Sequence, residues 1–331
     1  MRAKAMRNKF PEAGERPPRK IRQPLDGVLL LDKPVGFSSN DALMKAKRLM
    51  NAKKAGHTGT LDPFATGLLP LCFGEATKFS QDLLDADKTY ETTVHLGVAT
   101  DTGDTEGQIV QQTALPEALD ALQIEAVLAQ FRGDILQVPP MYSALKRDGK
   151  PLYEYARAGI TLERAARAVT IFELQLIDWQ APFLKLRVKC SKGTYIRVLG
   201  EDIGKALGVG AHLQALRRVQ VGHLLLDGAI SMPDLEAMDE NQRGSLLAAP
   251  DALLSTFPAV YLTQELATRF LHGQRLALGN TGLDLPGAEQ LAQGAGRVRV
   301  YLQQELPRLL GTAHLSEFSV LAPERLIAYT Q

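Results

Sequence analysis

Apolar and polar residues alternate in several short stretches of the chain, a period of two that is typical of strands with one buried face. Residues 90–96, 184–190 and 297–302 all show this alternation. The continuous apolar run at residues 27–31 instead predicts a short strand that is buried on both faces. We therefore predict a strand at each of these four places.

Other stretches repeat their apolar side chains at the spacing of a helix. One helix is predicted after Ser38 or Ser39, because either hydroxyl can cap the first turn. A second is predicted from about residue 116 to residue 131, and a third over residues 196–207, where Ile196, Leu199, Ile203 and Leu207 share one face. Helices and strands are thus interspersed along the chain.

The bulk composition describes a globular protein. Of the 331 residues, 45% are hydrophobic and 23% are charged, and the formal net charge is only +1, so any affinity for nucleic acid must come from local clusters of Lys and Arg. Two cysteines, Cys72 and Cys190, make no disulfide framework and suggest a reducing compartment. The longest apolar run, at residues 67–74, is far shorter than the roughly 20 residues of a membrane span. We expect a soluble, cytoplasmic protein.

The composition also divides the chain into three parts. Residues 1–24 carry eight Lys or Arg and four prolines, and they predict a disordered basic tail that either adds non-specific affinity for RNA or is inert. Near residue 250 the character changes to short candidate strands with glycine turns, which predicts a small β-rich domain over residues 251–331. Residues 25–250 then form the main domain.

The stretch from residue 56 to residue 70 concentrates the candidate chemistry. It holds one carboxylate, Asp62, in a loop with three glycines and Pro63. The proline biases Asp62 toward an extended backbone, from which the side chain can project. An Asp-Pro pair in isolation would more often be a capping turn. The sequence of the whole stretch, GHTGTLDPFATGLLP, is more specific than that of an ordinary turn.

This stretch resembles the GHTGxLDPxATGxLP signature of the TruB-type tRNA pseudouridine synthases, in which the aspartate is catalytic. Phe64 stands where that family more often has an aliphatic residue. The words QVPPMYSALK and PLYEYARAGI are a second, independent match, and they resemble the mobile thumb segment that closes over the RNA, at about residues 132–160. The resemblance is strong from about residue 25 to residue 225 and weaker beyond.

The resemblance implies an α+β protein with the pseudouridine synthase fold, a mixed and largely antiparallel sheet with flanking helices. The C-terminal domain, at residues 251–331, resembles a PUA RNA-binding module. The glycine-rich turn that such a module leads us to expect after Leu309 is reduced here to residues 311–314. Contact of this domain with RNA is therefore a weaker expectation than its fold.

Roles for the supporting residues follow from the same resemblance. Arg197 is expected to pair with Asp62, and such a pair keeps a carboxylate charged inside a dry pocket, where desolvation would otherwise raise its pKa. Lys33 and Pro34 resemble the family motif that braces the catalytic loop from behind. We treat both as structural.

Four further residues are implied to touch the target nucleotide. Tyr90 would stack on the base, Tyr195 would lie on its opposite side and bond near the nucleophile, and Leu216 would close the apolar wall. Stacking is worth about 1 to 3 kcal/mol per base and does not distinguish bases. His57 would contact the nucleotide as it is extruded from the folded RNA, which costs a few kcal/mol.

The activity implied is the isomerisation of the T-loop uridine of tRNA, position 55, to pseudouridine. The bond from the sugar to N1 breaks and the base is re-attached through C5. Whether Asp62 attacks the sugar, attacks the ring or abstracts a sugar proton stays open. We expect no cofactor and no metal, because the six histidines are scattered and the acidic loop at residues 101–107 lacks EF-hand spacing.

The implied partner is the T arm of tRNA, with no obligate protein partner, no membrane and a monomeric enzyme. Lys and Arg residues at positions 45–54 directly precede the central loop, and they predict either contact with phosphates or a solvated face. Three rival functions stay open: an RNA-binding protein without chemistry, a glycosidase or nucleosidase, and a relative that depends on guide RNA. A glycosidase commonly needs two carboxylates flanking the bond, and the central motif supplies one.

Overall fold

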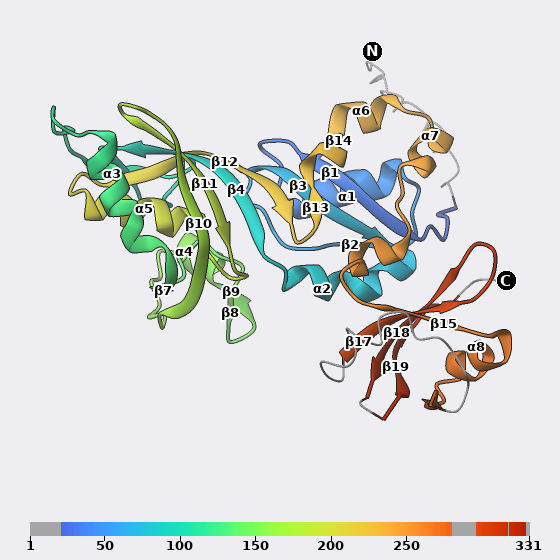
Figure 1. Ribbon diagram of the computed structural model, residues 1–331. Coiled ribbons are helices and arrows are strands. Elements are labelled where there is room, and N and C mark those ends of the chain that lie inside the picture. Colours follow the sequence, from blue (N-terminus) through green and yellow to red (C-terminus); the bar gives the residue numbers. More distant parts are fainter. Residues whose placement is uncertain (1–20, 280–295, 317, 329–331) are drawn as a thin grey trace, which may run out of the picture.

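Two sheets organise the chain in this computed structural model (Figure 1), which describes residues 21–279, 296–316 and 318–328. The larger sheet has ten strands and runs through an elongated main body, and a five-stranded sheet forms a separate C-terminal layer beside one end of it. Most of the predicted basic tail, residues 1–20, lies outside the described residues.

The larger sheet is mixed and mostly antiparallel. Among its strands only the β1–β14 and β3–β12 pairs are parallel. Its principal path is, in order, β14 (Ile230–Ser231), β1 (Gly27–Lys33), β3 (Thr66–Phe73), β12 (Ala211–Val221), β4 (Lys88–Leu96), β11 (Phe183–Cys190), β10 (Arg167–Gln180) and β7 (Gly133–Gln137). Two short strands lie off this path, β2 (Ala55–His57) against β3 and β13 (Leu224–Leu225) against β12. This is the fold class that the sequence predicted.

The four predicted strands are confirmed. Runs 27–31, 90–96, 184–190 and 297–302 fall within β1, β4, β11 and β17 (Gly296–Leu302). In β4 the even-numbered residues from Thr92 to Leu96 are buried and Glu91 is exposed, which is the alternation expected of a strand with one face in the core.

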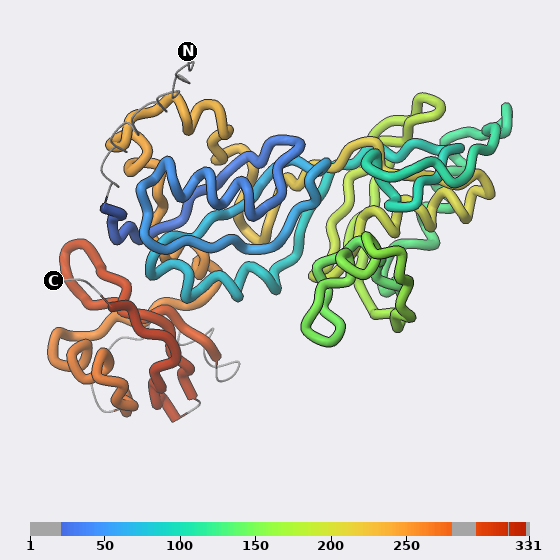
Figure 2. The backbone as a smooth tube through the Cα atoms, turned by 180° about the vertical axis from the view of Figure 1, so that it is seen from behind, coloured from blue at the N-terminus to red at the C-terminus, as the bar shows by residue number. Residues whose placement is uncertain are grey.

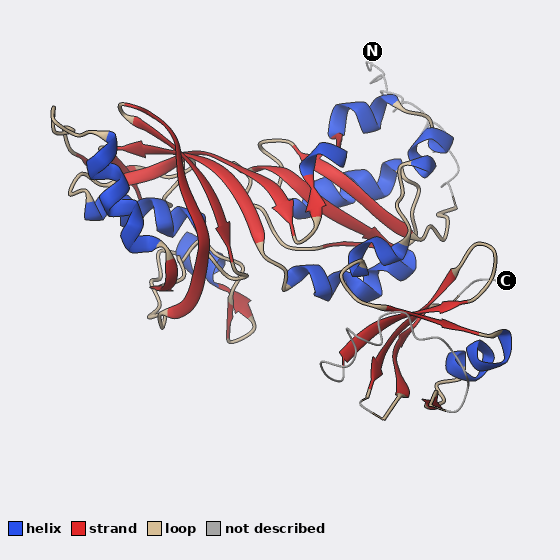
Figure 3. Ribbon diagram, viewed as in Figure 1, coloured by secondary structure: helices blue, strands red, loops and turns tan. Residues whose placement is uncertain are grey.

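Helices flank both halves of the sheet (Figure 3). Helix α1 (Ser39–Leu49) packs on β1 and β3, and α3 (Ala121–Leu128) and α5 (Ile196–Ala206) pack on the other half. The remaining helices are α2 (Ser80–Leu84), α4 (Leu152–Arg157), α6 (Met232–Ala237), α7 (Glu240–Ser245) and α8 (Gln264–Leu271). No helix in the described ranges combines the length and the apolar character needed to cross a membrane.

Two predicted helix starts are decided by capping. The hydroxyl of Ser38, rather than that of Ser39, accepts the Asp41 N–H and caps α1. The helix predicted from residue 116 begins instead at Ala121, because the Asp120 carboxylate caps it by accepting the Gln123 N–H. The prediction of its start was therefore wrong by five residues, while its end is right if the final 3-10 turn, Ala129–Phe131, is included.

The two halves of the larger sheet join at a narrow seam (Figure 2). There β3 and β12 pair over only two positions, Thr66 with Arg217 and Gly67 with Arg218. The Arg217 guanidinium reaches across β3 and binds both carboxylate oxygens of Asp32 on β1, at 2.6 and 3.1 Å. Gly67 has φ +101°, and a Cβ built there would lie 2.3 Å from the Arg218 carbonyl oxygen. The seam therefore requires glycine at position 67.

The C-terminal domain is a sheet in the order β15 (Ala259–Leu262), β17 (Gly296–Leu302), β18 (Arg308–Leu315), β19 (Val320–Leu326) and β16 (Leu276–Ala277). Residues 311–314, expected as the remnant of a glycine-rich turn, lie instead inside β18. Gly311 is needed there because a Cβ would lie 2.0 Å from the Arg325 carbonyl oxygen on β19. This part of the expectation was wrong, and the PUA-like character of the domain rests on the sheet as a whole.

The C-terminal domain shares a hydrophobic cluster with the main body. Tyr301 and Leu309 pack in this cluster with Phe79 and Leu83, which lie in and next to the 3-10 helix η1 (Gly74–Phe79). Arg297 also pairs with Asp82 of α2. The two sheets are thus joined by buried apolar contact as well as by charge.

The chain is anchored to the main body before the predicted end of the tail. The Gln23 N–H donates to the Asn51 carbonyl at 2.8 Å, and the Lys53 N–H donates to the Gln23 carbonyl at 2.9 Å. Residues 21–24, which the sequence assigned to the tail, therefore hold a defined position against the segment that follows α1.

We expect Gly67→Ala to lower the free energy of unfolding by at least about 3 kcal/mol, because it adds a backbone clash to an unfavourable φ. Gly149→Ala is the matched control: its φ is +78°, with nothing within 4 Å of a new Cβ. The control should cost only about 1 to 2 kcal/mol. Urea denaturation followed by circular dichroism measures both, and equal costs would show that close packing at the seam is unimportant.

Candidate active site

The loop that carries Asp62 joins β2 to β3 and is held from two sides. The Ser39 hydroxyl accepts the Leu61 N–H at 2.7 Å and donates to the Leu61 carbonyl at 3.1 Å. On the other side of Asp62, the Lys33 ammonium donates to the Pro63 carbonyl at 3.4 Å. The residues before and after Asp62 are therefore fixed by side chains from the beginning of α1 and the end of β1.

Lys33 is fully buried and is held chiefly by carbonyl oxygens. Its ammonium donates to Pro34 at 2.9 Å and to Phe37 at 2.6 Å, in addition to its contact with the Asp62 loop. Burial lowers the pKa of Lys33 to about 8, and the nearby charge of Asp62 opposes this effect. Lys33 thus contacts the Asp62 loop directly, and the bracing role that the resemblance implies for Lys33 and Pro34 stays a prediction.

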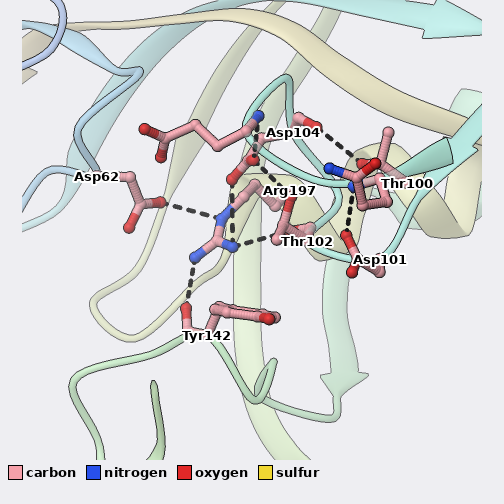
Figure 4. Close-up of polar contacts among 9 residues, drawn as sticks. Asp62, Thr100, Asp101, Thr102, Asp104, Tyr142 and Arg197 are labelled. Carbon is pink, nitrogen blue, oxygen red and sulfur yellow. Dashed lines mark hydrogen bonds and ion pairs between the residues drawn. The ribbon is translucent and has the colours of Figure 1, made fainter. Parts of the chain in front are cut away.

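Arg197, in the first turn of α5, ties four segments together (Figure 4). Its side chain is only 4% exposed, and its Nε lies 3.0 Å from an Asp62 carboxylate oxygen. Nη1 donates to the Thr102 carbonyl at 2.9 Å and lies 3.4 Å from a carboxylate oxygen of Asp104. Nη2 donates to the Tyr142 carbonyl at 2.7 Å. A buried guanidinium is thus satisfied by two carboxylates and two carbonyls.

Two effects oppose each other at the Asp62 carboxyl group. Desolvation raises its pKa above the ordinary 3.8, and Arg197 lowers it by charge and by a hydrogen bond. The buried carboxylate of Asp104 raises it further, while Lys33 lowers it. Asp62 side-chain exposure is 36%, so one side of the carboxylate is open to the cleft while the other is bound. The arrangement presents an aspartate whose ionisation depends on Arg197.

A small pocket of about 180 Å³ brings the predicted residues together. Asp62 and Arg197 line it from one side. Tyr90 from β4, Tyr195 from the N-cap of α5 and Leu216 from β12 also line it. The remaining lining residues are Thr60, Leu61, Ser143, Ala144, Thr194 and Ile196. Two aromatic rings and apolar side chains thus lie near a carboxylate, which suits a flat heterocycle.

Tyr195 is positioned through its backbone. The Gln137 side chain, 2% exposed at the end of β7, accepts the Tyr195 N–H at 3.1 Å and donates to the Tyr195 carbonyl at 3.4 Å. Between the described side chains of Tyr195 and Asp62 no direct hydrogen bond forms, although the resemblance implies a bond near the nucleophile. Burial raises the pKa of the Tyr195 hydroxyl, so it is neutral at physiological pH.

A larger cleft of about 730 Å³ opens beside the pocket. It is lined by His57, by the beginning of α1 at residues 38–40, by the turn at 101–108 and by residues 142–144 of the predicted thumb segment. The thumb segment also contains the hairpin of β8 (Lys146–Arg147) and β9 (Lys150–Pro151) and helix α4, and the turn connects β5 (Val98–Thr100) to β6 (Ile109–Gln112). Burial and the charge of Arg218 lower the pKa of His57, which keeps its ring neutral.

Buried polar atoms without a hydrogen-bond partner gather around this site. In the described part of the chain they are His57 Nδ1, Thr58 Oγ1, Ser143 Oγ and, remote from the site, Asp82 Oδ2. Such groups are rare in folded proteins and each needs an explanation. Three of the four border the pocket or its loop.

Sequence reasoning missed three positioning residues. Asp104 was noted only as a member of an acidic loop, Ser39 only as a candidate cap, and Gln137 only as part of a motif. The contacts of Asp104 and Gln137 span 93 and 58 positions of sequence, as residues 104 to 197 and 137 to 195. The one local signal in the sequence was that polar residues occur inside stretches that match a motif.

The basic residues between 45 and 54 lie along α1 and in the segment that follows it, and their contact with phosphates stays a prediction. The beginning of α1 lines the cleft, and Lys47 and Arg48 lie in the last turn of this helix, at least about 10 Å along its axis. Lys45 pairs with Glu236 of α6. For the described residues, no cluster of His, Cys, Asp and Glu is suited to holding a metal ion.

Comparison with known proteins agrees with this geometry. Residues 47–196 match the TruB family pseudouridylate synthase (N terminal domain), residues 197–255 the tRNA pseudouridylate synthase B C-terminal domain, and residues 258–327 the C-terminal region of pseudouridine synthase II TruB. Among solved structures, a Cbf5-Nop10-Gar1 complex aligns with a TM-score of 0.65 and 25% identity over 96% of this chain and 91% of that one. The fold is that of the pseudouridine synthases.

Sequence relatives are closer. A tRNA pseudouridine synthase B of Burkholderia mallei (strain ATCC 23344) is 62% identical over 310 residues, 94% of this chain and 96% of the relative. One of Ralstonia pickettii (strain 12J) is 59% identical over 321 residues, 94% of this chain and 97% of the relative. The chain therefore belongs to the TruB family of pseudouridylate synthases.

We expect the pKa of Asp62 to lie above 3.8 and to respond in opposite directions to its two charged neighbours. Asp104→Asn removes a negative charge and should lower this pKa, and Arg197→Met removes a positive charge and should raise it. Carbon-13 NMR titration of labelled aspartate carboxyl groups, assigned with Asp62→Asn, measures the shifts. If neither substitution changes the pKa of Asp62, its carboxyl group does not interact with Arg197 and Asp104.

Proposed function

We propose that the protein isomerises the uridine at position 55, in the T loop of tRNA, to pseudouridine. The observation that carries this proposal is the position of Asp62 in a pocket lined by Tyr90, Tyr195 and Leu216. Its relatives, which cover nearly the whole chain, are named tRNA pseudouridine synthase B. The size and lining of the pocket suit one flipped nucleotide rather than a duplex.

In the proposed reaction the target uridine leaves the RNA stack and enters the small pocket. Tyr90 stacks on the base, and Tyr195 and Leu216 bound its remaining sides. Asp62, kept ionised by Arg197, acts on the sugar or the ring, the N1 glycosidic bond breaks, and the base is re-attached through C5. The enclosed pocket retains the detached uracil between these steps, which explains why it needs walls as well as a carboxylate.

The surrounding elements have proposed roles in RNA binding. His57, at the edge of the cleft, contacts the extruded nucleotide, and residues 132–160 act as a thumb over the T arm. Residues 25–250 are the catalytic domain and residues 251–331 an RNA-binding domain. We propose a monomer that acts alone in the cytoplasm, where unmodified tRNA is its substrate.

The rival functions differ in their products. An RNA-binding protein without chemistry would not need an ionised aspartate in an enclosed pocket, and a nucleosidase would release free uracil. Of the other carboxylates near Asp62, that of Asp104 faces Arg197 and is buried, whereas Glu106 lines the same cleft as Asp62. The product of the reaction therefore decides against or for a nucleosidase. A guide-dependent enzyme would require partner proteins, whereas purified protein alone is expected to modify an unmodified tRNA transcript.

Asp62→Asn is expected to abolish tritium release from C5-labelled uridine in tRNA, while affinity for tRNA stays within about tenfold, a change of about 1.4 kcal/mol or less. The reason is that only the chemistry requires the charged carboxylate. Filter binding and the release assay measure the two quantities separately.

The matched control is Asp85→Asn, which removes a surface carboxylate that is paired with Lys192 and is not part of the pocket lining. It should leave both quantities unchanged. Parallel loss of binding and turnover in Asp62→Asn would make the residue structural, and free uracil as the product would revive the nucleosidase.

A further inference from the structure

Arg218 is a second buried arginine beside the pocket, and none of the roles above uses it. Its residue exposure is 1%. On β12 it lies directly opposite Tyr90 of β4, and it follows Leu216 by two positions, so all three side chains project from the same face of the sheet. Two of these three residues line the small pocket, and Arg218 lies immediately behind them.

The contacts of Arg218 reach both ends of the Asp62 loop. Its Nε donates to the Leu68 carbonyl at 2.8 Å, and its Nη2 donates to the Gly59 carbonyl at 3.3 Å. The positive charge of the guanidinium also acts on the Tyr90 hydroxyl and opposes burial, which raises the pKa of Tyr90 to about 12. One side chain thus connects the loop of the proposed nucleophile with the proposed stacking ring.

The charge of Arg218 is not neutralised by a carboxylate. Arg197 faces Asp62 and Asp104, whereas no described acidic side chain forms an ion pair with Arg218. Burial accordingly lowers the pKa of Arg218. A buried charge without a counter-ion destabilises the fold, since neutral carbonyls compensate it only in part. Such an arrangement is expected where the charge serves a function.

The proposed reaction supplies the missing anion. If Asp62 attacks the sugar or removes a sugar proton, the N1–C1′ bond breaks with its electron pair on N1, and uracil departs as an anion. If Asp62 adds to C6 of the ring, the electron pair of the C5–C6 double bond moves toward the C4 carbonyl oxygen. After re-attachment C5 loses a proton and N1 gains one, so the negative charge on the base is transient in every route.

We propose that Arg218 stabilises the negative charge that develops on the uracil, acting through Tyr90, and at the same time fixes the loop of Asp62. The inference rests on the proposed function. Arg218 does not line the pocket, so it is a positioning and electrostatic residue rather than a catalytic one. Its field is strong because the guanidinium is buried and no acid in the described ranges pairs with it.

The test uses the full-length protein with an unmodified tRNA transcript labelled at C5 of uridine, under single-turnover conditions with enzyme in excess. Arg218→Met should slow tritium release by about 100-fold or more, the effect typical of losing one preorganised electrostatic contact. Affinity for tRNA should stay within about threefold, and Arg218→Lys, which retains the charge, should react at least about ten times faster than Arg218→Met.

The control is Arg187→Met, which removes the same charge from β11, the strand next to β4, where the side chain is 40% exposed and paired with Glu91. It should react within about threefold of the wild type. The melting temperature of every variant is measured as well. An Arg218→Met variant that melts at the wild-type temperature but reacts slowly supports the proposal, because its fold is then intact.

Folded Lys and Met variants that are equally slow, or an Arg218→Met variant as fast as the wild type, would overturn the proposal. If neither variant folds, Tyr90→Phe decides, because it removes the connecting hydroxyl and keeps the ring: a slowed rate supports the proposal and a full rate overturns it. Absence of release by the wild-type protein would instead refute the proposed function itself.

Discussion

The Arg197 guanidinium is the interaction on which the site depends. A buried positive charge must find partners, and this one binds a carboxylate on the β2–β3 loop, a second carboxylate in the β5–β6 turn and a carbonyl at Tyr142. Three segments that are remote in sequence are therefore fixed relative to α5 by one side chain. Asp104 and Asp62 share the positive charge of Arg197. Asp62 therefore binds Arg197 from one side and keeps its other side open toward the cleft.

The construction of the sheet explains how these segments meet. The loop of Asp62 belongs to the half that contains β1 and β3, while Tyr90, Leu216 and Arg197 belong to the other half. The site therefore forms across the seam, where β3 and β12 pair over only two positions. A close approach at Gly67 and two adjacent arginines, one facing Asp32 and one facing the loop carbonyls, hold the halves in register.

Local patterns in the sequence could predict the strands and the motif loop, but not the partners of the buried polar groups. The prediction of β4 and β11 succeeded because their alternation is unbroken, while β10 and β12 each contain two register shifts that displace the pattern. The candidate residues lining the pocket were identified from motifs that resemble those of a known family, not from the periodicity of apolar residues. Asp104 and Gln137 were not predicted, because their contacts are with residues distant in sequence and no local pattern indicates such contacts.

The two buried arginines stabilise different negative charges in the proposed reaction. Asp62 is ionised before the reaction, and its negative charge passes to the base as it forms a covalent bond or takes up a sugar proton. The pocket therefore has to stabilise an anion first on Asp62 and then on the uracil. A guanidinium that is neutralised by two carboxylates, as Arg197 is, has little field left for the base. In the proposal the charge on the uracil is stabilised by Arg218, which has no acidic partner among the described residues and is buried behind Tyr90. The desolvation of Arg218 destabilises the empty enzyme, and the charge that relieves it forms only during the reaction.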